Sequence, residues 1–172
     1  EATASIVRCF VENNLDKTGS FQKLYYMGPM FRLERPQKGR LRQFHHIGCE
    51  AIGSREPGVD VETISLACQL LKAFSIQGFE LNLNSLGCAE DKKELSKLLQ
   101  KGLKDQAGKL CEDCQNRLKG NILRILDCKN DPCREVVRKL EIGNSYLCPD
   151  CKGHFDSVRN GLNALKINFT LN

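Results

Sequence analysis

The sequence predicts an α+β fold, in which helices flank an antiparallel sheet, together with a mainly helical inserted domain. Residues 23–33 and 41–52 form two apolar, strand-like stretches joined by a polar loop. Apolar residues recur instead at helical spacing over 61–74, 95–103 and 155–165. Hydrophobic residues make up 41% and charged residues 27% of the chain, which excludes a disordered tail or a coiled coil.

The N-terminal elements are expected to be a helix followed by a hairpin. Apolar residues at helical spacing predict the helix over residues 2–13. The first strand contains Gly28 and Pro29, which predict an irregular point because proline lacks an N–H for the ladder. A turn at residues 36–39 then leads into the second strand. The simplest interpretation is an antiparallel pair joined by a long basic loop.

A second helix and a third strand are expected after the hairpin. Asp60 could cap a helix over residues 61–74, because its carboxylate can accept hydrogen bonds from free N–H groups of the first turn. Apolar and polar residues alternate over 79–84, which predicts a strand.

The pattern becomes mostly helical after residue 87 and alternates again at the end of the chain. We therefore expect residues 1–87 to form a first domain, 88–166 a helical inserted domain, and 167–172 a strand that returns to the first domain. The first residue is not Met and lies within a predicted helix, which suggests a fragment of a longer protein. No apolar run approaches the roughly 20 residues that span a bilayer, and no signal peptide is evident, so a cytoplasmic location is expected.

Positive charge is concentrated in one short segment. Residues 32–42 contain five positive residues and one negative residue, whereas the rest of residues 1–87 contains five positive and eight negative residues. A solvated basic turn is one interpretation. Arginine is also suited to polyphosphates because its planar guanidinium makes bidentate hydrogen bonds, and Phe44 on the second strand could stack on a base. The segment is therefore a candidate anion site.

The hairpin has a specific family resemblance. Residues 26–50, YMGPMFRLERPQKGRLRQFHHIGCE, closely resemble the second signature motif of class II aminoacyl-tRNA synthetases in the form found in the histidyl-tRNA synthetase family. Residues 1–4 look like the histidine-binding segment of that family, and 81–87 look like the strand that leads into its insertion domain. The resemblance covers nearly the whole chain and is strongest over 23–53. It implies that residues 1–87 are a partial class II catalytic core, that 88–166 are the mainly helical insertion domain of the family, and that 167–172 return to the core.

The resemblance implies roles in ATP binding for four residues. Arg32 would be the catalytic residue, because it would hold the α-phosphate of ATP and the carboxylate of histidine. Glu34 would lie near the adenine and Arg40 near the outer phosphates, while Phe44 would stack on the adenine ring. The implied reaction joins histidine to ATP, with Mg²⁺ as its ion, and then transfers histidine from the adenylate to tRNA(His).

The resemblance also implies a histidine pocket. Glu1 and Thr3 would bind the α-amino group, Glu50 would face the imidazole, and Arg32 would hold the carboxylate. His46 stands where the family usually has glutamine. Histidine can donate and accept one hydrogen bond as an amide does, but it can also become protonated near neutral pH.

Two alternatives compete with the synthetase interpretation. One is the histidine-binding regulatory paralogue of histidine biosynthesis, which Arg32, Glu34 and Arg40 argue against because it would not need to handle ATP. The other is a zinc-dependent nucleic-acid-binding module. The resembled enzyme is a homodimer, and the motif that forms its dimer interface has no counterpart here, so we expect little aminoacylation by this chain alone.

Ten cysteines are many for a chain of 172 residues, and seven of them lie after residue 87. Two C-x2-C pairs predict a four-cysteine structural zinc site. The pairs are Cys111 with Cys114 and Cys148 with Cys151. Cys128, Cys133 and His154 are further potential ligands, so several ligand sets are compatible with the spacing, and ordinary buried thiols are the alternative to a metal site.

Overall fold

The computed structural model describes residues 2–33, 35 and 37–171. These residues form a mixed structure of helices and strands that divides into two compact units, Glu1–Gln77 and Gly78–Asn172. The division falls earlier than the boundary expected at residue 87. Each unit has its own elements and is described separately.

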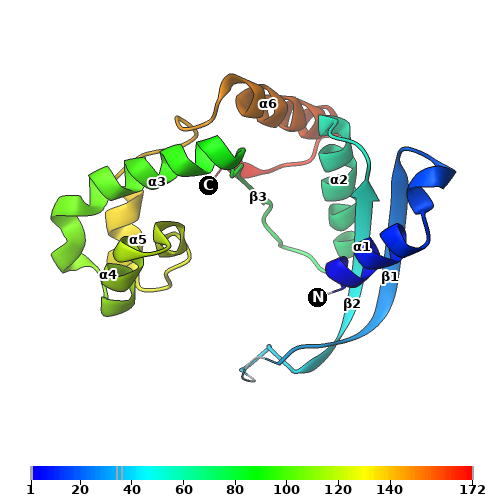
Figure 1. The fold of residues 1–172 in the computed structure, drawn as a ribbon, viewed down its shortest axis with the longest axis horizontal. Coiled ribbons are helices and arrows are strands. Elements are labelled where there is room, and N and C mark those ends of the chain that lie inside the picture. Colours follow the sequence, from blue (N-terminus) through cyan, green and yellow to red (C-terminus); the bar gives the residue numbers. More distant parts are fainter. Residues whose placement is uncertain (1, 34, 36, 172) are drawn as a thin grey trace. The chain divides into compact units, whose positions relative to one another are not determined.

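A long hairpin dominates the first unit (Figure 1). Strand β1 (Gln22–Phe31) pairs antiparallel with β2 (Gln43–Ile52), as the sequence predicted. The expected irregular point is wrong, because Pro29 lies opposite His45 in unbroken register. In a two-stranded sheet each strand has a free edge, where a missing N–H costs no ladder hydrogen bond.

The helices of the first unit precede and follow the hairpin. Helix α1 (Thr3–Glu12) lies where the sequence placed it, and the 3-10 turn η1 (Leu15–Thr18) follows. Helix α2 (Pro57–Ala73) begins earlier than predicted, so the expected cap at Asp60 is wrong. Proline is favoured in the first turn because its fixed φ is helical and the N–H it lacks would have had no partner there. Asp60 lies in that first turn instead.

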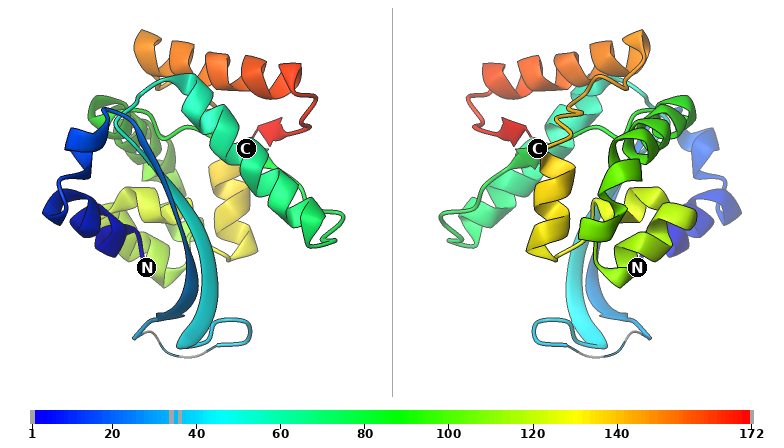
Figure 2. Two further views of the ribbon diagram at one scale, coloured as in Figure 1. Left: turned by 90° about the vertical axis from the view of Figure 1, so that its right-hand side faces the viewer. Right: turned by 90° about the vertical axis from the view of Figure 1, so that its left-hand side faces the viewer.

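The second unit is built mainly from helices (Figure 2). In chain order its elements are β3 (Asn82–Leu83), α3 (Ala89–Leu103), η2 (Lys104–Lys109), α4 (Glu112–Lys119), η3 (Ile122–Ile125), α5 (Asp131–Arg138), α6 (Pro149–Ala164) and β4 (Thr170–Leu171).

A hydrophobic core lies beneath one face of α3. Leu95, Leu99 and Leu103 recur every four residues and are at most 5% exposed. They belong to a cluster of buried residues that also contains Leu110, Cys114, Ile122, Ile125, Cys133 and Tyr146. The short elements from η2 to α5 therefore pack around this one core.

The end of the chain pairs with the strand that precedes α3. Strands β3 and β4 are parallel, with Asn82 opposite Thr170, and Thr170 N donates to Leu81 O at 2.9 Å. Only two residues of the strand predicted over 79–84 have strand geometry. The insertion of residues 88–166 between strands of the first domain stays a prediction. No helix within the described ranges is long and apolar enough to cross a membrane.

Candidate functional site

One face of the hairpin carries the central residues of the predicted ATP and histidine site. Side chains alternate between the faces of a strand, so Phe44, His46 and Glu50 share one face of β2. All three are half-buried, whereas His45, Ile47 and Cys49 on the opposite face are exposed. Met30 of β1 lies opposite Phe44 and extends this face. We call it the site face of the hairpin.

Arg32 continues the site face beyond the end of β1. Its backbone N–H donates to Arg42 O at 2.9 Å, which prolongs the ladder by one pair. Its guanidinium carbon lies 3.8 Å from the centre of the Phe44 ring, a cation–π contact. Arg32 Nε is buried without a hydrogen-bond partner among the described residues, and so is His46 Nδ1. Two unsatisfied polar atoms on one face indicate that a ligand could complete their hydrogen bonding.

Tyr26 supports the site face, a role that the sequence interpretation missed. Its ring meets that of His46 edge to face, with centroids 5.3 Å apart. The ring lies over Gly48, where an added Cβ would stand 2.2 Å from Tyr26 Cζ. The signal was available in the sequence as a glycine on the second strand, but only the register placed it opposite Tyr26.

The remaining predicted residues lie elsewhere or outside the described residues. Thr3 is exposed at the start of α1, and no hydrogen bond between described residues joins it to the hairpin. Arg40 is exposed in the loop, where it forms an isolated bridge with Gln37. Glu1 and Glu34 lie outside the described residues. The structure thus brings Arg32, Phe44 and His46 together.

The cysteines of the second unit gather into two separate groups, so the predicted zinc ligand set is wrong. Within each group the potential ligand atoms lie within 4.8 Å of one another. The four-cysteine cluster consists of Cys111, Cys114, Cys128 and Cys133, and the Asp91 cluster consists of Cys88, Asp91, Cys148 and Cys151. The two C-x2-C pairs begin different helices, α4 and α6, and each pair meets its own neighbours.

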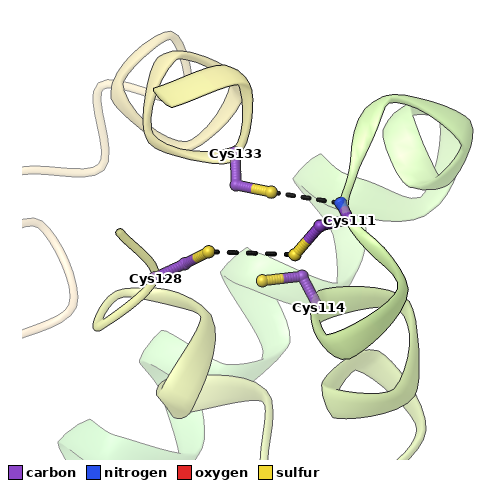
Figure 3. A group of neighbouring side chains, drawn as sticks. All are labelled: Cys111, Cys114, Cys128 and Cys133. Atoms are coloured by element: carbon purple, nitrogen blue, oxygen red, sulfur yellow. Dashed lines mark hydrogen bonds between the residues drawn. The ribbon is translucent and has the colours of Figure 1, made fainter. Parts of the chain in front are cut away.

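Three short segments form the four-cysteine cluster (Figure 3). Cys111 and Cys114 come from the start of α4, Cys128 from the loop after η3, and Cys133 from α5. Cys111 N donates to Cys133 Sγ at 3.2 Å. A hydrogen bond from the backbone of Cys114 lowers the pKa of Cys111, whereas burial raises the pKa of Cys114 and of Cys133.

The Asp91 cluster joins the starts of two helices. Asp91 is 3% exposed, and its Oδ2 accepts from Cys88 N at 3.1 Å while its Oδ1 accepts from Cys148 N at 2.9 Å. These residues precede α3 and α6, so the carboxylate lies at the positive ends of both helix dipoles. Hydrogen bonds from the Cys151 side chain and from these backbones lower the Asp91 pKa to about 2. The hydrogen bond to Asp91 in turn raises the pKa of Cys151 to about 12.

Comparison with known proteins decides the family. A family model described as histidyl-tRNA synthetase matches residues 1–119. The chain belongs to the histidyl-tRNA synthetase family. Among curated relatives, the histidine–tRNA ligase of Moorella thermoacetica is 47% identical over 171 residues, which are 99% of this chain and 40% of that protein. The corresponding ligase of Syntrophotalea carbinolica is 45% identical over 172 residues, which are 100% of this chain and 41% of that protein.

A solved structure agrees with the histidyl-tRNA synthetase assignment. The apo histidyl-tRNA synthetase of S. aureus matches with a TM-score of 0.69 and 30% identity, covering 100% of this chain and 40% of that one. The chain therefore spans about two fifths of the length of these synthetases. The relatives favour a fragment of histidyl-tRNA synthetase over the regulatory paralogue and the zinc-dependent nucleic-acid-binding module.

Proposed function

We propose that this chain is the part of a histidine–tRNA ligase that holds ATP and histidine while histidyl-adenylate forms. The observation that carries the proposal is the pair of buried, unpartnered nitrogen atoms, Arg32 Nε and His46 Nδ1, beside the Phe44 ring. The complete enzyme would then transfer histidine to tRNA(His). Its ATP would carry Mg²⁺, and we propose a cytoplasmic location and a homodimeric parent protein.

Arg32 has the chemistry that adenylate formation requires. The attack of the histidine carboxylate on the α-phosphate brings two anions together, and a fixed guanidinium favours both their approach and the charge that develops in the transition state. The contact with Phe44 orients the guanidinium before ATP binds. When adenine stacks on Phe44, Arg32 would exchange this ring contact for hydrogen bonds to the α-phosphate.

The opposite end of the site face suits the histidine side chain. Glu50 can accept a hydrogen bond from the imidazole N–H, and it lies on the same face as His46. His46 Nδ1 is buried without a partner among the described residues, so it is available for a hydrogen bond to the ligand. The proposal keeps the other roles that the resemblance implies. Glu1 and Thr3 would bind the α-amino group of histidine, Glu34 would lie near the adenine, and Arg40 would lie near the outer phosphates.

The test is calorimetric binding of a non-hydrolysable histidyl-adenylate analogue, with the alanyl analogue as the ligand control. We expect Arg32→Ala to weaken binding strongly, because it removes a charge-assisted contact to the phosphate. Arg35→Ala is the matched control, since Arg35 is an exposed arginine of the same loop. Equal binding of the two analogues, or equal effects of the two substitutions, would contradict the proposal.

The chain by itself is expected to show little aminoacylation, because it spans only about 40% of the related ligases. The titration should therefore be repeated on the full-length protein that contains this sequence. Binding by the full-length protein but not by this chain would assign the missing affinity to the other segments. Structural zinc also remains a proposal, with ligands different from the predicted set.

A further inference from the structure

The four-cysteine cluster belongs to the second compact unit, whereas the proposed adenylate site belongs to the first, and the proposed reaction gives the cluster no role. Four of the ten cysteines converge here from three separate segments, and all ten are free thiols. Simple packing does not require sulfur at each of four adjoining positions, since aliphatic side chains fill such cores elsewhere in the same unit.

The sulfur atoms have the spacing of a tetrahedral metal site. Zinc–sulfur bonds of about 2.3 Å place the sulfurs of a tetrahedron about 3.8 Å apart. Cys111 Sγ and Cys128 Sγ are 3.9 Å apart, and all four sulfurs lie within 4.8 Å of one another. This spacing is far longer than the roughly 2.05 Å of a disulfide bond. It is also too short for an iron–sulfur cluster, whose inorganic core must separate the ligand sulfurs further.

We propose that the four-cysteine cluster binds one structural zinc ion. Four thiolates form a closed tetrahedral set with no open position for substrate, which is typical of structural rather than catalytic zinc. The spacing of the four cysteines along the sequence is also typical of structural zinc sites. Cys111 and Cys114 form a C-x2-C pair, and Cys128 and Cys133 form a C-x4-C pair.

Donors around the cluster are placed to stabilise thiolates. Cys111 N donates to Cys133 Sγ at 3.2 Å, and Asn130 N donates to Cys128 Sγ at 3.5 Å. Arg117 Nη1 lies 3.9 Å from Cys114 Sγ and also donates to Arg124 O at 3.1 Å, which holds the guanidinium beside the sulfur. One zinc ion with four thiolates carries a net charge of −2, and these N–H groups and this cation offset it.

A structural ion has a clear purpose in this part of the chain. Helices α4 and α5 contain only eight residues each, and η3 contains four. Isolated helices of that length are not stable in water, and small cores often depend on a metal cross-link. Zinc would join the start of α4, the loop after η3 and the start of α5 next to the leucines of α3.

The Asp91 cluster does not carry the same proposal. Both oxygens of Asp91 already accept backbone N–H groups that begin α3 and α6, so the carboxylate acts as a shared helix cap. The cluster therefore provides internal controls. Cys148 and Cys151, which the sequence grouped with Cys111 and Cys114, should not bind the zinc ion.

The decisive experiment is native mass spectrometry of the 172-residue chain, purified under reducing conditions and supplied with zinc. We expect one zinc ion per chain, with a denatured mass that corresponds to ten reduced thiols. Cys128→Ser should lose the ion, and the matched control Cys148→Ser should keep it. Zinc retained by Cys128→Ser, or its absence from the unsubstituted chain, would overturn the proposal.

Differential alkylation of the unsubstituted chain avoids variants that fail to fold. Cys111 and Cys128 are only half-buried, so burial alone would not protect both of them. We expect zinc to protect both, and a chelator to make both reactive, while the reactivity of Cys88 stays the same. Equal reactivity of Cys128 with and without zinc would count decisively against the site.

Discussion

The hairpin of the first unit and the helical core of the second differ in how much of their own packing they contain. Leu99, Leu103 and Ile125 of the second unit are at most 1% exposed. On the hairpin, Tyr25 is 83%, Met27 is 73% and Leu33 is 94% exposed. Large apolar side chains are thus buried in the second unit and exposed on the hairpin of the first.

This difference shows that different interactions stabilise the two units. The second unit encloses a core and, by our proposal, adds a metal cross-link. The hairpin relies on its backbone ladder and on a few contacts of the site face, such as Tyr26 with His46. The proposed adenylate site, with its two buried and unpartnered nitrogen atoms, therefore belongs to the unit with the smaller core.

The largest effect on stability is expected from truncation in the core of the second unit. Leu99→Ala removes a fully buried side chain and leaves a cavity, which should cost about 2–5 kcal/mol. Hydrogen exchange of α3 amides would measure the loss, because it reports opening of this unit separately. Protection of α3 unchanged within error would show that the core does not stabilise the unit.

A smaller effect is expected where the hairpin is tightly packed. Gly48→Ala would place a methyl group against the Tyr26 ring, which must move away from His46. We expect destabilisation of about 1–3 kcal/mol and weaker binding of the histidyl-adenylate analogue. Thermal unfolding and calorimetry would measure the two effects. Cys49→Ser, at the next position on the exposed face, is the control.

Acid should weaken the second unit through Asp91. The pKa of this carboxyl is lowered from 3.8 to about 2, so ionised Asp91 stabilises the fold at every pH well above 3.8. That contribution is lost as the pH falls from about 4 to about 2. Circular dichroism between these pH values should show a loss of helix that is reduced in Asp91→Asn, which does not titrate. The same acid profile in both proteins would exclude Asp91 as the cause.

The smallest effect is expected at exposed apolar residues of the hairpin. Leu33→Ala should change the free energy of unfolding by less than about 0.5 kcal/mol, because the side chain is already 94% exposed. Urea unfolding of this variant beside Leu99→Ala would measure the contrast directly. A large loss from Leu33→Ala would mean that the two units are packed more alike than the exposures indicate.

Local patterns predicted most of the elements correctly. Apolar, strand-like stretches located both hairpin strands, and leucines at helical spacing located α3. The predicted start of helix α2 was wrong, because the helix begins at Pro57 and Asp60 lies in its first turn. The motif from residue 26 to 50 indicated the family, and the match to the histidyl-tRNA synthetase model confirms it.

The pairing of distant residues could not be obtained from spacing. Two C-x2-C motifs indicated one metal site, but the tertiary structure separates Cys114 from Cys151 and brings Cys133 to Cys111 instead. Likewise, only the strand register showed that Tyr26 lies over Gly48. Which residues suit a metal or a phosphate is a property of side-chain chemistry, and the sequence by itself determined that. Which of them meet depends on the path of the backbone between them, and only the tertiary structure decided it.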